Sequence, residues 1–207
     1  MWEDPAALRP VLASIAEGGA DARPEGIVVL GGRKSAYSRE EWPWLGDVEE
    51  LMRLAIARGV RLLGICLGAQ LLAVANGGEV EVGAPAGPEY GVTPLSWSPA
   101  ALEDPLGAAL SRFGVVFEDH GDAVSRVPEG ARVWARSAKY PQVIRLGCAL
   151  GVQFHPEVDR GLAASWNAAN PDTDTQRVLA DFDAHEEALA AACALLAAWV
   201  ATGETGR

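Results

Sequence analysis

Cysteine and basic residues are scarce in this sequence of 207 residues. The three cysteines, Cys66, Cys148 and Cys193, are few and odd in number, which argues against a disulfide framework and indicates free thiols in a reducing compartment. Lysine and arginine number 17 against 28 aspartates and glutamates, which leaves a formal charge of -11. Because phosphate groups are bound by basic patches, this balance argues against nucleic acid as a partner.

Targeting signals and long hydrophobic segments are also lacking. The first residues, MWEDPAALRP, are acidic where a signal peptide is basic, and no long apolar core follows them. The longest uncharged apolar run, residues 188–201, is rich in alanine and shorter than the roughly 20 residues that cross a bilayer. We therefore expect a soluble, cytoplasmic protein without a membrane partner.

Apolar residues are plentiful enough for one sizeable core. Hydrophobic residues make up 49% of the chain and charged residues 22%, so disorder is not expected. There is no internal repeat and no low-complexity linker, and this length is typical of one domain. We predict a single domain over residues 1–207.

Short apolar runs alternate with segments of helical periodicity. Runs that are bounded by glycines or rich in β-branched residues predict buried strands, and apolar residues at intervals of three and four predict helices. The predicted strands are residues 26–32, 60–65, 114–117, 132–135, 142–146 and 149–154, and the predicted helices are residues 46–58, 67–75 and about 174–201. This alternation indicates an α/β fold with a mostly parallel sheet covered on both faces.

Residues 64–70, GICLGAQ, place Cys66 between two glycines where a strand meets a helix. A nucleophile on such a turn is lifted above the carboxyl edge of the sheet, as in the G-x-S-x-G turn of hydrolases. The same pattern also fits a small buried thiol beside a glycine turn. Because a nucleophilic cysteine needs a base and a group that orients the base, the histidines decide between the two interpretations.

Two of the three histidines offer little to such a nucleophile. His185 lies on the apolar stripe of the last predicted helix, where we expect it to pack in the core. His120 lies in the polar segment EDHGD and is either a surface residue or part of a pocket wall.

The third histidine is a better base. His155 ends the predicted strand 149–154, so it should emerge at a sheet edge, where α/β proteins form their sites. Glu157 follows two residues later, and strand periodicity places it on the same side as His155. A Cys66-His155-Glu157 triad is therefore the favoured interpretation.

These residues resemble the class I, triad-type glutamine amidotransferase family. Residues 64–71, GICLGAQL, are similar to its nucleophile motif, and residues 151–158, GVQFHPEV, to its His/Glu motif, in the same order and at a similar separation. LGG at 30–32 resembles the loop that supplies one oxyanion-hole donor. PEYG at 88–91 and HGD at 120–122 resemble weaker landmarks around the glutamine site.

The resemblance implies a flavodoxin-like three-layer sandwich with a catalytic core over about residues 26–160. Cys66 would attack the glutamine side-chain amide, His155 would activate the thiol and protonate the departing ammonia, and Glu157 would orient His155. The backbone N–H groups of Gly32 and Leu67 would form the oxyanion hole. The residues implied to hold the substrate are Gly31, Gln70, His120, Gly121 and Asp122. No metal or nucleotide cofactor is implied, and the sequence has no Gly-x-x-x-x-Gly-Lys phosphate loop.

The oxyanion loop departs from the family pattern. The family continues Gly-Gly with proline, whereas residues 31–35 here read GGRKS. Arg33 and Lys34 either form an exposed basic turn or bind an additional anionic group of the substrate, which makes Arg33 a candidate binding residue.

The N-terminal segment is a second departure. The family opens with a strand, a helix and a second strand, but only residues 1–25 precede the strand at Ile27. Residues 5–16 can supply the helix, whereas residues 1–4 are too short and polar for a core strand. A shortened, exposed sheet edge is prone to association, so we expect a homodimer or a partner subunit.

Three functions are consistent with the sequence. The first is a glutaminase that supplies ammonia to a separate synthetase, because no acceptor domain is predicted in this chain. The second is hydrolysis or transfer at a γ-glutamylated intermediate or peptide, to which the altered loop at Arg33 points. The third is a non-catalytic binding or regulatory module, against which the intact Cys66, His155 and Glu157 argue.

Overall fold

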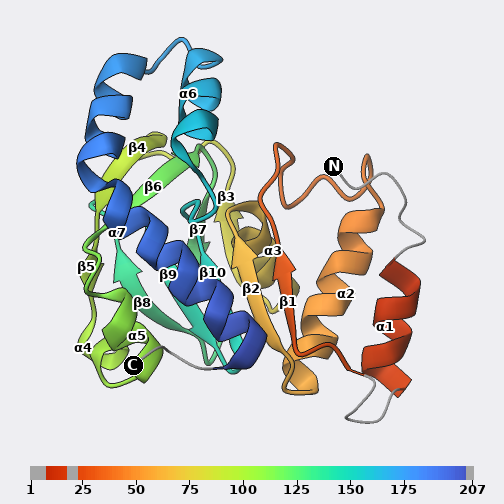
Figure 1. Cartoon of the computed structure of the whole chain (residues 1–207). Helices are drawn as coiled ribbons and strands as arrows, with labels where there is room; N and C mark the ends of the chain where they lie inside the picture. Colours follow the sequence, from red (N-terminus) through yellow and green to blue (C-terminus); the bar gives the residue numbers. More distant parts are fainter. Residues whose placement is uncertain (1–7, 18–22, 204–207) are drawn as a thin grey trace.

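The computed structural model describes residues 8–17 and 23–203, and it builds them around a six-stranded sheet (Figure 1). The strands lie side by side in the order β1-β2-β10-β9-β8-β5. Their bounds are β1 Gly26–Val29, β2 Arg61–Ile65, β10 Ala149–Val152, β9 Pro141–Leu146, β8 Arg132–Arg136 and β5 Ser96–Trp97.

The sheet is mixed, so the expectation of a mostly parallel sheet is wrong. β1, β2 and β10 pair in parallel, whereas β10, β9, β8 and β5 pair antiparallel. The chain reverses between β9 and β10 within two residues, Gly147 and Cys148, and Gly147 adopts a φ of 56°. A parallel pairing needs a crossover of about a dozen residues, which so tight a reversal excludes. The α/β class itself is confirmed.

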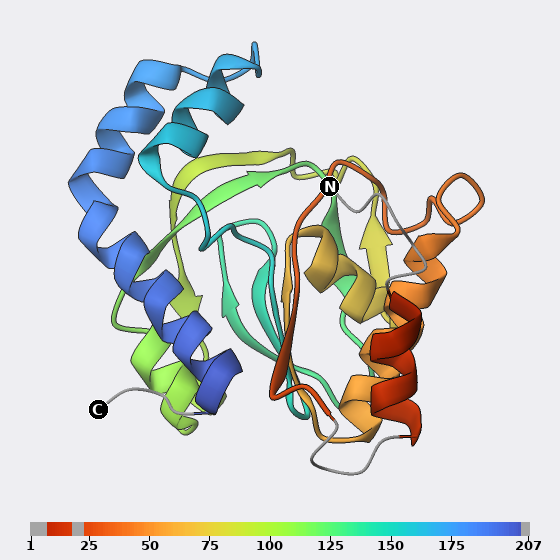
Figure 2. The ribbon, with the colours of Figure 1, turned by 45° about the vertical axis from the view of Figure 1, so that its right-hand side comes forward.

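Helices cover both faces of the sheet, as the three-layer prediction requires (Figure 2). One face carries α1 Leu8–Glu17, α2 Trp44–Ala57 and α3 Leu67–Ala75, and the other carries α4 Pro99–Leu102, α5 Pro105–Leu110 and α7 Thr175–Thr202. Side chains of β2 alternate between the two layers: Leu62 packs with α1–α3, and Leu63 and Ile65 pack with the helices opposite.

Two antiparallel strand pairs flank the main sheet. β4 Glu89–Pro94 pairs with β6 Val115–His120, and β3 Glu79–Glu81 pairs with β7 Ala123–Arg126. The backbone N–H of His155 donates to the carbonyl oxygen of Phe117 at 2.8 Å, which ties β6 to the segment after β10. The end of β6 therefore lies beside the carboxyl ends of the parallel strands.

The long C-terminal helix carries the predicted apolar stripe with one exception. The side chain of Asp174 caps the first turn of α7 by accepting from the N–H of Arg177, and Gly203 ends the helix at a φ of 75°. The buried residues are Val178, Phe182, Leu189, Ala192, Leu196, Trp199 and Val200. The expectation that His185 packs in the core is wrong, because residues 183–187 are all exposed.

Among the helices of the described residues, α7 alone is long and apolar enough to cross a membrane. The uncharged run at residues 188–201, which is too short to cross a bilayer, is thus only part of this longer helix. In this structure its stripe packs against β1, β2, β4 and β6. A helix that covers a sheet in this way meets the same length and composition criteria, so the criteria are weak evidence for a membrane span.

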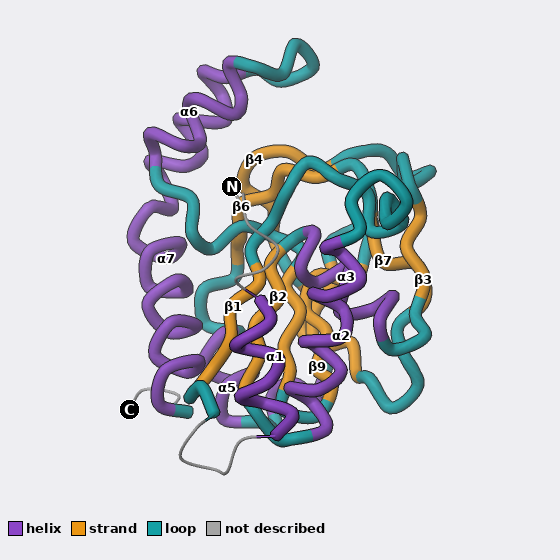
Figure 3. Tube along the Cα trace, turned by 90° about the vertical axis from the view of Figure 1, so that its right-hand side faces the viewer, coloured by secondary structure: helices purple, strands orange, loops and turns teal. Residues whose placement is uncertain are grey.

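α6 Arg160–Ala168 is absent from the sequence-based prediction. It packs against the N-terminal half of α7 at one end of the molecule (Figure 3). The side chain of Asp159 caps α6 by accepting from the N–H of Leu162. The guanidinium of Arg160 donates to the carboxylate of Asp183 on α7 at 2.6 Å. This helical pair carries a tryptophan, Trp166, toward the site described below.

The predicted N-terminal edge is only partly within the described residues. The helix expected in residues 5–16 corresponds to α1, whereas residues 1–4 lie outside the described ranges. Within those ranges β1 is an edge strand that pairs only with β2. Val28 is 46% exposed and Leu30 59% exposed, so this edge presents apolar side chains to solvent.

Candidate active site

Cys66 occupies the sharp turn between β2 and α3. Its backbone has φ 50° and ψ -108°, and it is the one non-glycine residue in the described ranges with a positive φ. Such a conformation persists only where the surrounding structure imposes it. The N–H of Cys66 donates to the carbonyl oxygen of Val152 at 2.8 Å, which holds the turn against β10. This is the geometry of a nucleophile turn.

The glycines on either side of Cys66 permit close backbone contacts. A Cβ atom on Gly64 would lie 2.6 Å from the carbonyl oxygen of Gly68. A Cβ atom on Gly68 would lie 2.2 Å from the carbonyl oxygen of Val29. Any side chain at either position would therefore force α3 away from the strands that position the thiol.

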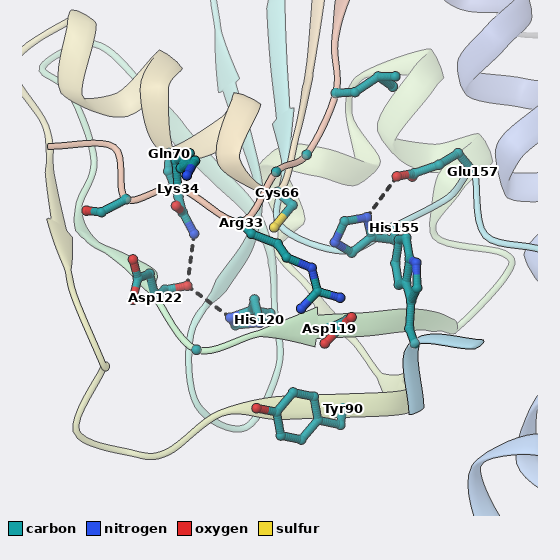
Figure 4. Close-up of a pocket in the computed structure, with 16 residues that line it drawn as sticks. Arg33, Lys34, Cys66, Gln70, Tyr90, Asp119, His120, Asp122, His155 and Glu157 are labelled. Atoms are coloured by element: carbon teal, nitrogen blue, oxygen red, sulfur yellow. Dashed lines mark hydrogen bonds and ion pairs between the residues drawn. The ribbon is translucent and has the colours of Figure 1, made fainter. Parts of the chain in front are cut away.

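His155 lies beyond the end of β10 and faces Cys66 (Figure 4). Its Nδ1 is 2.8 Å from Oε1 of Glu157, and the opposite edge of the ring is directed at the sulfur. The structure thus brings Cys66, His155 and Glu157 together. Strand periodicity is not the reason, since β10 ends at Val152 and both His155 and Glu157 lie in the segment that follows it.

The His155 ring is restrained on several sides and holds its proton strongly. Burial acts to lower the pKa of His155, but hydrogen bonding to Cys66 and Glu157 outweighs burial and raises the pKa to about 10. Trp166 of α6 packs edge-on against the ring, with the two centroids 4.9 Å apart. The side chain is therefore a protonated, oriented imidazole at neutral pH.

The loop after β1 passes close to both the thiol and the imidazole. A Cβ atom on Gly31 would lie 2.8 Å from Cε1 of His155 and 3.2 Å from Cβ of Cys66. A Cβ atom on Gly32 would lie 3.2 Å from Cδ2 of Leu67. Leu67 is the first residue of α3, where a backbone N–H has no acceptor within the helix. The two predicted oxyanion donors, Gly32 and Leu67, therefore lie in adjacent segments beside the thiol.

A pocket of about 540 Å³ opens beside Cys66. The predicted site residues that line it are Gly31, Gly32, Arg33, Cys66, Gln70, His120, Gly121, Asp122, His155 and Glu157. Leu67, the other predicted oxyanion donor, is not among the residues that line it. Every residue predicted to hold the substrate thus borders one cavity.

Gln70 and Asp122 are fixed to each other and to the backbone around them. The side-chain amide of Gln70 is buried, and its Nε2 donates to the carbonyl oxygen of Asp122 at 3.0 Å. The carboxylate of Asp122 accepts from the N–H of Gly83 at 2.8 Å. These contacts hold the turn after β6 against α3, so the far wall of the pocket is rigid.

His120, which also lines the pocket, lies between two buried carboxylates. Its Nε2 is 3.2 Å from Oε2 of Glu89 and 3.3 Å from Oε2 of Glu118, and its Nδ1 is 3.0 Å from the carbonyl oxygen of Asp122. Both ring nitrogens face acceptors, as in an imidazolium. Burial acts to lower the pKa of His120, but its hydrogen bonds to Glu118 and Glu89 raise the pKa to about 10.

The same three residues are spaced as metal ligands would be. One ligand atom from each of Glu89, Glu118 and His120 lies within 4.8 Å of the others. A proton on Nε2 of His120 already accounts for that spacing, because it places one positive charge between the two carboxylates. We therefore interpret the cluster as a buried ion pair that supports the pocket wall.

The sequence did not single out Asp119 or Trp166 as pocket residues. Asp119 on β6 pairs with Tyr90 of the PEYG segment on β4, and Trp166 reaches the pocket from α6. The EDHGD segment contains Asp119, but no local pattern distinguishes its side chain from those of its neighbours. Trp166 lies in a helix that was not predicted, so its contact with His155 has no signal in the sequence.

This chain is similar to known proteins over more than half of its length. A family model described as glutamine amidotransferase class-I matches residues 8–166. The GMP synthase (glutamine-hydrolyzing) of Thermomicrobium roseum is 38% identical over 141 residues, which are 65% of this chain and 24% of that protein. The corresponding protein of Streptococcus thermophilus is 37% identical over 139 residues, with the same shares of the two chains. The chain therefore matches about a quarter of the length of these curated relatives.

Solved structures give a similar result. A glutamine amidotransferase from Thermotoga maritima superposes with a TM-score of 0.71 at 27% identity, covering 89% of this chain and 81% of that chain. A glutamine amido transferase from Methylobacillus flagellatus also has a TM-score of 0.71, at 29% identity, covering 87% of this chain and 77% of that chain.

Proposed function

Because this chain belongs to the class I glutamine amidotransferase family, we propose that it hydrolyses the side-chain amide of glutamine at Cys66 and releases glutamate and ammonia. The observation that best supports the proposal is the position of His155, hydrogen-bonded to Glu157 and directed at the Cys66 sulfur on a nucleophile turn. A cysteine acts as a nucleophile when a base and an orienting group are arranged in this way.

The first half of the proposed reaction acylates the thiol. In the free enzyme His155 holds the proton of the Cys66 thiol, in keeping with its raised pKa, and the sulfur then bonds to the amide carbon of glutamine. Negative charge then develops on the amide oxygen, where the N–H groups of Gly32 and Leu67 would stabilise it. His155 returns the proton to the amide nitrogen as the carbon–nitrogen bond breaks, which releases ammonia and leaves a γ-glutamyl thioester.

The second half returns the enzyme to its starting state. Water attacks the thioester carbonyl and gives a proton to His155, and the same backbone donors stabilise the second oxyanion. The carbon–sulfur bond then breaks, which restores the sulfur beside protonated His155, and glutamate leaves. Glu157 keeps Nδ1 of His155 occupied throughout, so the opposite nitrogen serves both steps.

The ammonia is proposed to pass to a separate synthetase. The relatives named GMP synthase extend well beyond the matched region, which makes up about a quarter of their length. The exposed edge of β1, with Val28 and Leu30, is a surface that such a partner or a second copy of the chain could cover. A free thiol as nucleophile also fits a reducing, cytoplasmic location.

The test is release of glutamate and ammonia from glutamine by the purified chain, alone and with candidate synthetases. Cys66→Ala should abolish release, whereas Cys193→Ala, a matched thiol removal on α7, should not affect it. Because activity can depend on a partner, labelling of Cys66 by a chloroketone analogue of glutamine is measured alongside. Absence of both turnover and labelling would contradict the proposal.

The same measurements separate the two other functions. Cleavage of a γ-glutamyl amine or peptide without cleavage of glutamine would favour a γ-glutamyl hydrolase or transferase, which the presence of Arg33 in the pocket makes worth testing. Failure of every γ-glutamyl compound to react would favour a non-catalytic module of this fold.

A further inference from the structure

Two side chains of opposite charge line the pocket from separate elements. Arg33 lies in the loop after β1, and Asp119 lies on β6. In Figure 4 the guanidinium of Arg33 extends into the pocket below Cys66 and toward the carboxylate of Asp119. The two residues come from segments far apart in the sequence, so only the folded chain places them opposite each other.

Neither of these two side chains makes a direct polar contact within the described residues. No hydrogen bond or ion pair within the part of the chain that the structure describes involves the side chain of Arg33 or of Asp119. Asp119 is partly buried, and burial raises the pKa of its carboxyl, while the charges of His155 and Arg33 act in the opposite direction. The Asp119 carboxylate and the exposed Arg33 guanidinium therefore keep hydrogen-bonding positions that a ligand in the pocket can use.

The other charged side chains of the pocket already have partners. The Lys34 ammonium lies 3.8 Å from the ring centroid of Trp42. The Asp122 carboxylate is bound to the N–H of Gly83, and Glu157 is bound to His155. The structure thus separates the two cations of the altered loop: Lys34 turns to the surface aromatic ring, and Arg33 enters the pocket.

We propose that Arg33 and Asp119 together bind the α-carboxylate and the α-ammonium group of the γ-glutamyl donor. The inference rests on the proposed function, because it places the acyl carbon of that donor at Cys66. A glutamyl group carries one negative and one positive group on a single carbon, three carbons from the amide. A guanidinium and a carboxylate that face each other match this pair of charges, and a guanidinium fork binds a carboxylate through two parallel hydrogen bonds.

The proposal makes the pair a determinant of substrate specificity. A donor that lacks either α-group would leave one of the two charges without a partner in the complex, and a polar group left without its partner allows a site to reject an analogue. The leaving side of the amide does not contact this pair. Arg33 and Asp119 should therefore select the glutamyl half of the substrate and be indifferent to the amine that departs.

The experiment compares glutamine with its analogues that lack the α-carboxylate (4-aminobutanamide) or the α-amino group (4-carbamoylbutanoate). Arg33→Gln should lower kcat/KM for glutamine about 10- to 100-fold, the effect of one lost charge-assisted hydrogen bond, and leave kcat/KM for 4-aminobutanamide unchanged. Asp119→Asn should lower kcat/KM for glutamine similarly and leave 4-carbamoylbutanoate unchanged. Arg136→Gln removes an exposed cation on β8 that does not line the pocket and should alter none of these values.

A second readout does not depend on turnover or on a partner. The rate at which the chloroketone analogue of glutamine labels Cys66 is compared with the rate for the same reagent without its α-amino group. Wild type should prefer the complete reagent, and Asp119→Asn should lose that preference. Circular dichroism confirms that each variant is folded, as expected for positions that are not fully buried.

The outcomes distinguish this inference from the proposed function. If wild type is labelled at Cys66 but the variants retain full discrimination, or lose reactivity equally toward all compounds, the assignment of Arg33 and Asp119 is wrong and the proposed function stands. If wild type neither turns over nor is labelled, the proposed function fails and this inference fails with it.

Discussion

Cε1 of His155 lies 2.8 Å from the position that a Cβ atom on Gly31 would occupy. The loop after β1 and the segment after β10 therefore meet so closely that only glycine fits between them. On the other side of the ring, Trp166 packs at a centroid distance of 4.9 Å. The imidazole is thus confined between a backbone and an aromatic ring, which leaves it one orientation toward Cys66.

Gly31→Ala should consequently impair the site more than the fold. The added methyl group must displace His155, which Trp166 and Glu157 prevent from moving freely, or shift the loop that carries Gly32. We expect glutamine turnover and Cys66 labelling to fall about 100-fold, the contribution typical of a positioned proton-transfer group. Gly46→Ala on α2, where a Cβ atom would meet nothing within 4 Å, is the control. Equal rates in the two variants would show that His155 tolerates displacement.

Gly68→Ala should affect the fold itself. Its Cβ atom would lie 2.2 Å from the carbonyl oxygen of Val29, and a backbone atom cannot move aside as a flexible side chain can. We expect a loss of about 3 kcal/mol in the free energy of unfolding, at the upper end of overpacking costs. Gly46→Ala should instead gain about 0.5–1 kcal/mol from helix propensity. Urea denaturation monitored by circular dichroism measures both, and an unchanged midpoint for Gly68→Ala would contradict the close packing of α3 on β1.

Glu157→Gln should shift the pH dependence of the reaction. Hydrogen bonding to Cys66 and Glu157 raises the pKa of His155 to about 10 against the opposing effect of burial, so loss of the Glu157 charge should lower that pKa toward its ordinary value of 6.5. The alkaline limb of the profile of kcat/KM should move to lower pH, and the maximum should fall about 10- to 100-fold. Equal scaling at all pH values, with no displacement of the limb, would mean that Glu157 does not act through His155.

His120→Gln should make stability less dependent on pH. The folded-state pKa of His120, about 10, is above its ordinary value of 6.5, so its stabilising contribution is complete below pH 6.5 and is lost as pH rises through 10. The difference in free energy of unfolding between wild type and His120→Gln should be largest near pH 6.5 and shrink toward pH 10. Urea denaturation across this range tests it. A constant difference would indicate that His120 is neutral in the folded protein.

Of the two carboxyl groups of this cluster, Glu118 has its pKa raised by burial, and Glu89 has its pKa lowered. Burial acts to raise the pKa of Glu89, but hydrogen bonds from His120 and Ser137 outweigh it and lower the pKa below 4.5. The contribution of Glu89 is therefore present above pH 4.5 and is lost as pH falls below that value. His120→Gln should also reduce the loss of stability at acidic pH that comes from Glu89. Urea denaturation below pH 4.5 measures this loss.

The turn that carries Cys66 could be derived from the sequence because its causes are local. A strand, two glycines and a helix N-terminus within residues 60–75 specify a tight turn without reference to the rest of the chain. His155 and Glu157 were found for a similar reason, since both lie at the end of one strand. Strand alternation, from which the sequence analysis placed Glu157 beside His155, is not the cause of their contact. The segment after β10 brings Glu157 to Nδ1 of His155.

The tertiary structure decided everything that depends on contacts between distant segments. Strand propensity is the same for parallel and antiparallel neighbours, so the mixed pairing of β10 with β2 and β9 has no local signature. His185 follows the apolar period of α7 yet is exposed, because burial depends on what lies opposite a turn and not on the turn itself. The placing of Asp119 opposite Arg33, and of Trp166 against His155, likewise arises only when loops, sheet and helices pack together. The sequence by itself determined which residues form the nucleophile turn and its base, and only the packing of the folded chain determined which other charges and rings share the pocket with them.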